Sequence, residues 1–161
     1  MPIIAKDSGG TMFDPAPQGV HRAVCCDVID LGEQDTKFGR KHKVRIVWET
    51  EEENPSTRER YQVRSTYTLS LNEKSSLSRD LESWRGRKFT DEERRKGFDL
   101  SSLIGSNCQL QVIHNESSNG RTYANIQTVI PPQKGVDALV PRDYNPSERE
   151  GQGHADEEPF A

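Results

Sequence analysis

The stretch Thr36-Lys-Phe-Gly-Arg-Lys-His-Lys-Val-Arg-Ile-Val-Trp-Glu-Thr50 carries the pattern that decides the fold. Its second half, residues 42–50, alternates with the two-residue period of a β-strand, so that Val44, Ile46 and Trp48 share one face. The other face carries a mixed and mainly cationic set: Lys43, Arg45, Val47 and Glu49. We therefore expect a core strand that leaves one face positively charged.

The first half of the stretch is expected to be a basic loop around Phe38. Lys37, Arg40 and Lys41 give this loop its charge. A cationic strand face that continues into a cationic, aromatic-bearing loop is typical of a surface for a phosphate backbone and its bases. The same residues are also typical of a solvated strand face beside a charged turn, because charge runs on strand faces are common. Both interpretations stay open at this point.

The composition suggests that only part of the chain folds. Hydrophobic residues make up 31% of the 161 residues, and the mean hydropathy is -0.90; both values are low for a fully packed chain. No apolar run approaches the ~18 residues of a membrane span, and no leader for export is visible, so we expect a cytoplasmic protein. Cys25, Cys26 and Cys108 lack the spacing of a disulfide framework or a zinc site, so we expect reduced thiols.

The net charge of -4 hides an uneven distribution. Residues 20–131 contain 18 Lys and Arg against 17 Asp and Glu, a net charge of +1. Residues 132–161 contain 3 against 7, and residues 1–19 contain 1 against 2. The acidity therefore lies mainly in the carboxyl-terminal part. A nearly neutral domain can still carry a basic groove, although its field is weaker than that of a strongly basic protein.

We expect three parts: a flexible arm over residues 1–19, a folded domain over 20–131, and a disordered acidic tail over 132–161. Within the domain, the period-2 segments predict strands over residues 20–31, 42–50, 60–71, 108–114 and 121–130. The polar stretch 32–42 is expected to be a connection. Asn72 is the expected start of a helix that carries the apolar stripe Leu77, Leu81 and Trp84 and ends at Gly86.

The element order is three strands, a helix and two strands. This order predicts a mainly β fold, a five-stranded oligonucleotide-binding (OB) barrel with its helix between strands three and four. On the fifth strand, Ala124, Ile126, Thr128 and Ile130 are expected on one face, and Tyr123 and Val129 on the other. Trp48, Tyr61 and Tyr67 are expected in the core.

The chain finishes with His154-Ala-Asp-Glu-Glu-Pro-Phe-Ala161. This end resembles the acidic tip of the single-stranded DNA-binding proteins of bacteria and their phages. The residues that match that tip position by position are Asp156, Glu157, Glu158, Pro159 and Phe160. The domain phrases Lys37-Phe-Gly, His114-Asn-Glu-Ser and Tyr123-Ala-Asn-Ile126 look like those of small phage replication-associated proteins. Ala161 departs from the tip pattern, because it moves the chain carboxylate one residue away from Phe160.

The resemblance implies a protein that coats single-stranded DNA in replication or recombination, and from the residues themselves we expect no enzymatic activity, cofactor or metal. It also implies that the tip docks on replication or recombination proteins, and a homo-oligomer is compatible with it. An OB groove is bordered by the loops that join strands one and two and strands four and five. The residues expected to contact DNA there are Lys37, Phe38, Arg40, Lys41, Lys43, Arg45, Arg64, Arg121 and Tyr123.

Two other functions stay open. The first is a protein-interaction adaptor on the same barrel, with no affinity for nucleic acid. The second is a metal-dependent nuclease that uses the acidic run Glu51, Glu52 and Glu53, although such a run in a turn normally faces water. The sequence shows no general base beside Cys25 or Cys108, and it contains no phosphate-cradling Gly-Lys-Ser/Thr loop.

Overall fold

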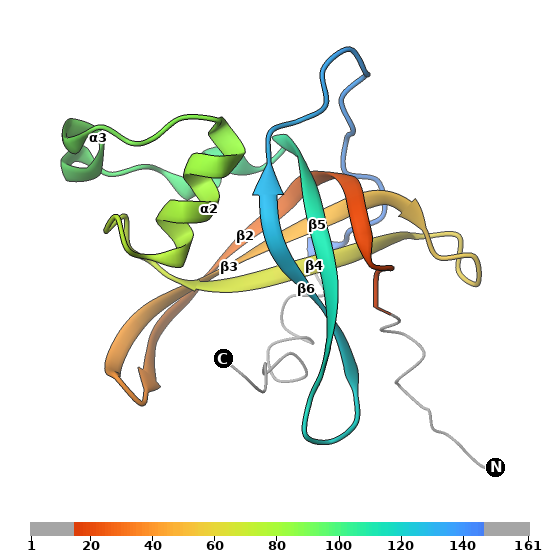
Figure 1. Cartoon of the computed structure of the whole chain (residues 1–161), viewed down its shortest axis with the longest axis horizontal. Helices are drawn as coiled ribbons and strands as arrows, with labels where there is room; N and C mark the ends of the chain where they lie inside the picture. Colours follow the sequence, from red (N-terminus) through yellow and green to blue (C-terminus); the bar gives the residue numbers. More distant parts are fainter. Residues whose placement is uncertain (1–14, 147–161) are drawn as a thin grey trace.

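One curved antiparallel sheet and a short helical insertion make up the fold (Figure 1). The computed structural model describes residues 15–146. Along the chain its elements are β2 (Gly19–Thr36), β3 (Gly39–Glu53), β4 (Arg60–Thr68), α2 (Ser76–Arg85), α3 (Asp91–Lys96), the 3-10 helix η1 (Leu100–Leu103), β5 (Asn107–Glu116) and β6 (Thr122–Ile130). The predicted mainly β fold with a helix between the third and fourth strands is confirmed. Within residues 15–146, no helix has the length and apolarity needed to cross a membrane.

Strand β2 is the centre of the sheet, whose order is β4-β3-β2-β5-β6. Residues 19–24 of β2 pair with β5, and residues 23–36 pair with β3. Register shifts after Cys25 and after Asp30 mark irregularities of the bulge type, which bend and twist a strand. This bending lets one strand serve both halves of the sheet. The edge strands β4 and β6 approach to within 8 Å between Cα atoms, but no hydrogen-bonded ladder joins them in the described part of the chain.

The inner face of the curved sheet holds the hydrophobic core. Val44, Ile46 and Trp48 of β3 are buried there, as predicted, and Trp48 is 0% exposed. Helix α2 packs against β6 and β4 with its predicted apolar stripe, which ends at Trp84. The ring centroids of Trp48 and Trp84 are 5.8 Å apart with the rings tilted by 48°, which is an arrangement that aromatic pairs favour. The core therefore joins the helix directly to β3.

The other two aromatic residues predicted for the core reach it to different extents. Tyr67 is buried, and its hydroxyl donates a hydrogen bond to Asp80 Oδ2 at 2.7 Å. Burial raises the pKa of Tyr67 well above its usual value. Tyr61 is half-buried at the margin of the core. Tyr67 therefore packs in the core and Tyr61 packs at its margin, and neither lies on an open face of the sheet.

Helix α2 begins later than the sequence predicts. Asn72 does not cap it, because its side chain accepts a hydrogen bond from the Lys74 amide at 2.9 Å and closes a local turn. The N-cap is Ser75, whose Oγ accepts a hydrogen bond from the Ser78 amide at 3.1 Å. Asn and Ser are both common caps, so spacing alone did not separate them. The predicted end at Gly86 is confirmed by its φ of 79°.

Strand β6 turns a different set of residues inward at its carboxyl end. A register shift beside Gln111 makes that residue pair with Thr128, while Val112 pairs with Ile126. The extra residue reverses the alternation, so Val129 is 0% exposed in the core. The prediction that Thr128 and Ile130 share a face with Ala124 and Ile126 is therefore wrong.

The polar stretch 32–42, predicted to be a connection with a basic loop, is a β-hairpin. Strands β2 and β3 stay paired until Thr36 faces Gly39, with Lys37 and Phe38 at the turn. Gly39 has a φ of 101°, a conformation that residues with a Cβ atom rarely adopt. The hairpin extends away from the rest of the sheet (Figure 1).

The described end of the predicted amino-terminal arm is docked on the sheet. Ala16 is buried in the core cluster. His114 Nε2 donates a hydrogen bond to the Ala16 carbonyl at 2.7 Å, and His21 Nε2 donates one to the Pro17 carbonyl at 2.7 Å. Residues 15–18 therefore differ from the flexible arm expected for them, and both histidines have structural partners.

We expect Leu81→Ala to lower the free energy of unfolding by about 2–5 kcal/mol, because Leu81 is buried beneath the sheet and the change leaves a cavity. Urea denaturation measures this loss. Ser76→Ala, at an exposed position of the same helix, is the control and should change stability by less than about 0.5 kcal/mol. Equal losses in the two variants would contradict the packing described for α2.

Candidate nucleic-acid interface

The hairpin formed by β2 and β3 carries much of the predicted positive charge. Lys37 and Phe38 form its turn, and Phe38 is 81% exposed. Thr36 Oγ1 accepts a hydrogen bond from the Phe38 amide at 3.0 Å and donates one to the Gly39 carbonyl at 2.6 Å. These bonds fix the turn. They hold an aromatic ring and a lysine at the turn of the β2–β3 hairpin.

The pairing register divides the cations of this hairpin between two faces. Arg40 faces Asp35 across the strands, and their side chains form an ion pair at 2.9 Å. His42 Nε2 lies 2.6 Å from Asp30 Oδ1 and shares that face. Its hydrogen bond holds the pKa of Asp30 below the usual value. Arg40 therefore lies among acidic groups on the continuation of the core face, opposite to the face that carries Lys41 and Lys43.

Sequence reasoning did not include these acidic partners. Asp30, Glu33 and Asp35 lie on β2 opposite the basic residues of β3. The signal was present in the sequence, because three acids precede the Lys-Phe-Gly turn and three basic residues follow it. Cross-strand pairs of opposite charge stabilise a hairpin by roughly 0.2–1 kcal/mol each. The β2–β3 hairpin is consequently less positive than the sequence of its second strand alone suggests.

The outer face of the sheet carries four of the predicted ligands together. Lys41, Lys43 and Arg45 follow one another at every second position of β3, and Arg64 of β4 pairs with Val47 next in that series. We call these four side chains, Lys41, Lys43, Arg45 and Arg64, the cationic row. Side chains two residues apart on a strand are separated by about 6.5–7 Å. The four side chains therefore lie in one line on the outer face.

The members of the cationic row differ in exposure. Lys41 is exposed and Lys43 is half-buried, with its Nζ donating a hydrogen bond to Thr68 Oγ1 at 3.0 Å. Arg45 is only 7% exposed, and its Nε donates to Thr66 Oγ1 at 3.2 Å. The threonines of β4 thus orient the two middle cations. A phosphate would reach Lys41 and Lys43 more readily than Arg45.

A second hairpin carries the remaining two predicted residues. Arg121 is exposed at the turn between β5 and β6, and Tyr123 pairs with Asn115. Tyr123 lies on the outer face, because its neighbour Ala124 packs against the core. This hairpin and the β2–β3 hairpin both extend from the lower side of the sheet in Figure 1. The structure thus places an exposed aromatic or cationic group at each hairpin.

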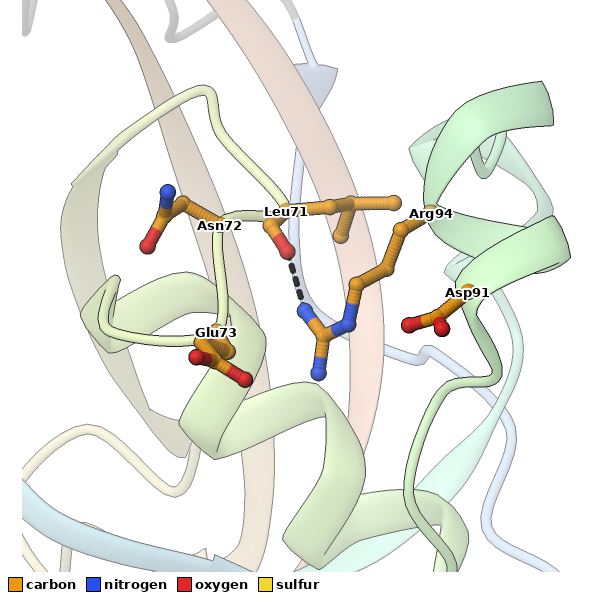
Figure 2. A pocket seen from close by; sticks show the side chains of 5 residues that line it. All are labelled: Leu71, Asn72, Glu73, Asp91 and Arg94. Carbon is orange, nitrogen blue, oxygen red and sulfur yellow. Dashed lines mark hydrogen bonds between the residues drawn. The ribbon is translucent and has the colours of Figure 1, made fainter.

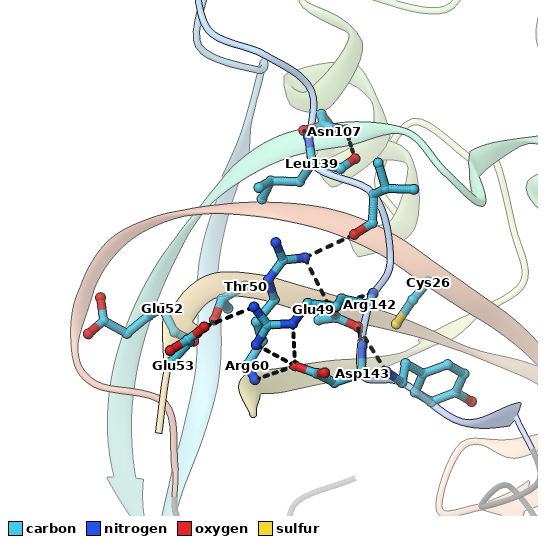
Figure 3. Close-up of polar contacts among 12 residues, drawn as sticks. Cys26, Glu49, Thr50, Glu52, Glu53, Arg60, Asn107, Leu139, Arg142 and Asp143 are labelled. Atoms are coloured by element: carbon cyan, nitrogen blue, oxygen red, sulfur yellow. Dashed lines mark hydrogen bonds and ion pairs between the residues drawn. The ribbon is translucent and has the colours of Figure 1, made fainter. Parts of the chain in front are cut away.

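The outer face also holds a segment that was expected to be disordered. Residues 137–145, which we call the strap, lie against β2, β3 and β4 through polar contacts (Figure 3). Glu49 is 0% exposed and accepts hydrogen bonds from three successive strap amides. The distances from its carboxylate are 2.9 Å to Arg142 N, 3.1 Å to Asp143 N and 2.9 Å to Tyr144 N. A buried carboxylate needs such donors, because an unpaired buried charge is costly.

Further contacts fix the strap along its length. Asn107 pairs with the backbone of Leu139, donating to its carbonyl at 3.0 Å and accepting from its amide at 2.8 Å (Figure 3). Arg142 forms an ion pair with Glu53 at 2.8 Å. Its guanidinium also holds the pKa of Asp143 below the usual value. The low apolar content misled the sequence prediction here, since hydrogen bonds to the sheet replace hydrophobic burial.

A hollow of about 530 Å³ lies away from the predicted ligands, between α3 and the end of β4 (Figure 2). Arg94 lines it and donates hydrogen bonds to the Leu71 carbonyl, to Ser78 Oγ at 2.9 Å and to Glu82 at 2.8 Å. These bonds join α3 to α2 and to the segment that follows β4. Arg94 therefore has a structural role in the helical insertion.

The three cysteines are buried, and Glu51 of the acidic run is held in an ion pair. Burial raises the pKa of Cys25 to about 12 and raises the pKa values of Cys26 and Cys108 as well, so thiolates are scarce at neutral pH. Glu51 forms an ion pair with Arg22 at 2.7 Å. Among residues 15–146, no three His, Cys, Asp or Glu side chains are grouped to hold a metal ion.

We expect Glu49→Gln to loosen the strap, because the neutral amide loses charge and one acceptor oxygen. Hydrogen exchange of the amides of residues 142–144 should accelerate, and the free energy of unfolding should fall by about 1–3 kcal/mol. Glu52→Gln, at an exposed position of the same strand, is the matched control. Unchanged exchange in Glu49→Gln would show that the remaining contacts alone hold the strap.

The predicted partner-binding residues Asp156, Glu157, Glu158, Pro159 and Phe160 lie outside the described residues. The nine predicted DNA contacts lie within them, at the two hairpins and on the outer face of β3 and β4. Arg40 is the one of the nine that the register separates from the cationic row by face. No protein-family model matches this chain, and no curated protein sequence matches it either.

Proposed function

We propose that this chain is a single-stranded DNA-binding protein without sequence preference, built on an OB-type barrel and acting in DNA replication or recombination. It protects unwound DNA and recruits partner enzymes through its carboxyl-terminal tip. The observation that carries the proposal is the cationic row on the outer face of β3 and β4, together with the exposed Phe38 on one hairpin and the half-buried Tyr123 on the other. The close approach of β4 and β6 supports the barrel, which a ladder between these edges would close.

The cationic row suits a flexible polyanion. Each Lys or Arg that neutralises a phosphate releases counterions, so affinity falls as salt rises. Lys41 and Lys43 lead from the hairpin toward the sheet, and Arg45 and Arg64 continue the track across it. A single strand laid on this face would meet successive charges. The acidic groups near Arg40 disfavour the same strand on the opposite face of the hairpin.

Aromatic residues supply the second part of the proposed DNA-binding surface, which is base stacking. Phe38 at one hairpin and Tyr123 at the other offer ring faces on which bases can stack, and each stacked base contributes about 1–3 kcal/mol by alanine substitution. Stacking does not distinguish bases, since every base has a π-face. Two such positions and a row of phosphate contacts therefore favour affinity without sequence reading.

The alternative is a protein-interaction adaptor without affinity for DNA. It is favoured by the near balance of charge on the β2–β3 hairpin, where Asp30, Glu33 and Asp35 oppose the cations. The nuclease is less well supported, because Glu51 and Glu53 would have to release Arg22 and Arg142 before binding a metal. Cleavage of an oligonucleotide with Mg²⁺ would favour the nuclease if it were lost when the run Glu51, Glu52 and Glu53 is replaced by glutamine.

Titration of the full chain with fluorescent oligo-dT at two salt concentrations tests the proposal. We expect binding at low salt that weakens steeply as salt rises. Lys43→Gln should weaken binding and reduce the slope of log K against log salt by about 0.7, the contribution of one phosphate contact on a single strand. Lys88→Gln makes the same charge change at an exposed position of the helical insertion and should leave the slope unchanged. Absence of binding at low salt would favour the adaptor.

Removal of residues 156–161 tests the assignment of the tip. The truncated chain has three fewer carboxylates that compete with phosphate, so its affinity for oligo-dT should be equal to or higher than that of the full chain. Its binding to partner proteins should be lost. The same fluorescence titration measures the first effect. Loss of DNA binding on truncation would show that the tip belongs to the DNA site and would contradict this assignment.

A further inference from the structure

The strap brings one aromatic side chain to the end of the cationic row. The backbone amide of Tyr144 donates to Glu49 Oε1 at 2.9 Å, and its hydroxyl donates to the carboxylate of Asp27. Glu49 and Val47 are successive outer-face positions of β3, and Asp27 is the partner of Val47 on β2. The side chain of Tyr144 therefore extends from Glu49 on β3 to Asp27 on β2, one outer-face position nearer to Arg45 along the strands.

Val47, the β3 residue beside this position, is also next to the two inner members of the cationic row. Arg45 is the next outer-face residue of β3 after Val47, and Arg64 is the partner of Val47 on β4. Successive outer-face positions are about 6.5–7 Å apart, a separation within reach of one nucleotide. Tyr144 is half-buried, so part of it remains accessible. An aromatic ring beside a track of phosphate ligands is the arrangement that binds single strands.

The acidic group under Tyr144 does not oppose this arrangement. Asp27 is 2% exposed, and its carboxylate also accepts a hydrogen bond from the Val28 amide at 2.8 Å. The carboxyl group of Asp27 is thus held within the sheet, beneath the tyrosine hydroxyl. Glu49 is buried in the same way by the strap amides and by Arg60, whose guanidinium lies 3.0 Å from it.

We infer that Tyr144 is a further nucleic-acid contact of this chain, a stacking position that the strap delivers to the end of the cationic row. The inference rests on the proposed function and extends the binding face from the hairpins to the carboxyl-terminal segment. It assigns to the strap a role in binding single-stranded DNA, in addition to its contacts with the sheet. Sequence reasoning missed Tyr144, because composition placed it in a tail without structure.

Three substitutions in the full chain separate stacking from strap anchoring. Tyr144→Phe keeps the ring and loses the hydrogen bond to Asp27, so its affinity for oligo-dT should stay within about twofold of the original. Tyr144→Leu and Tyr144→Ala lose the ring and should weaken binding by about 5- to 150-fold. The salt slope should be unchanged in all three, because no phosphate contact is lost.

Tyr144→Trp gives a direct signal, because stacking of a base on an indole quenches its fluorescence. Trp48 and Trp84 are buried and provide a constant background, measured in the unsubstituted chain. We expect quenching of the added fluorescence when oligo-dT binds. This readout does not depend on whether Tyr144→Ala loosens the strap.

Several outcomes would overturn the inference. Unchanged affinity in Tyr144→Leu, or equal weakening in Tyr144→Phe and Tyr144→Leu, would show that Tyr144 only anchors the strap. Binding of oligo-dT to the Tyr144→Trp chain without quenching would lead to the same conclusion. Failure of the unsubstituted chain to bind oligo-dT at low salt would instead overturn the proposed function itself, and the inference with it.

Discussion

The alternation of side chains along β3 is the constraint on which the rest of the structure depends. One strand must supply Val44, Ile46 and Trp48 to the core and Lys43 and Arg45 to the outer face. A slip of one residue would exchange these two sets. Pairing with β2 on one side and β4 on the other fixes the register, and the contact between Trp48 and Trp84 ties it to the helix. Core and candidate interface are therefore specified together.

Local patterns predicted the elements well. The strand periodicity of residues 42–50 and the apolar stripe of α2 both appear in the structure. These features depend on residues close in sequence, for which spacing is informative. The element order also predicted the place of the helix. The closure of a barrel depends instead on how far the sheet curves and which edges pair, and local patterns do not encode either property.

Features that depend on distant partners were not predictable. The reversal at Val129 follows from an irregular register between β5 and β6, and the long β2–β3 hairpin follows from continued pairing that a polar sequence conceals. The strap was missed for a different reason. Low hydropathy predicts disorder when burial is the only source of order, whereas residues 137–145 are held by hydrogen bonds to a buried carboxylate and to side-chain amides. The candidate site was accordingly incomplete at the end where Tyr144 lies.

The contact between Glu49 and the strap has a consequence for how such a chain can change over time. Its carboxylate receives main-chain N–H groups from Arg142, Asp143 and Tyr144, and every amino acid except proline supplies that donor. The residues of the strap can thus diverge widely in identity while the backbone of the strap keeps the same path. Divergence of this kind would erase similarity between related chains first in this segment, although the three hydrogen bonds to Glu49 would keep its path over the domain the same.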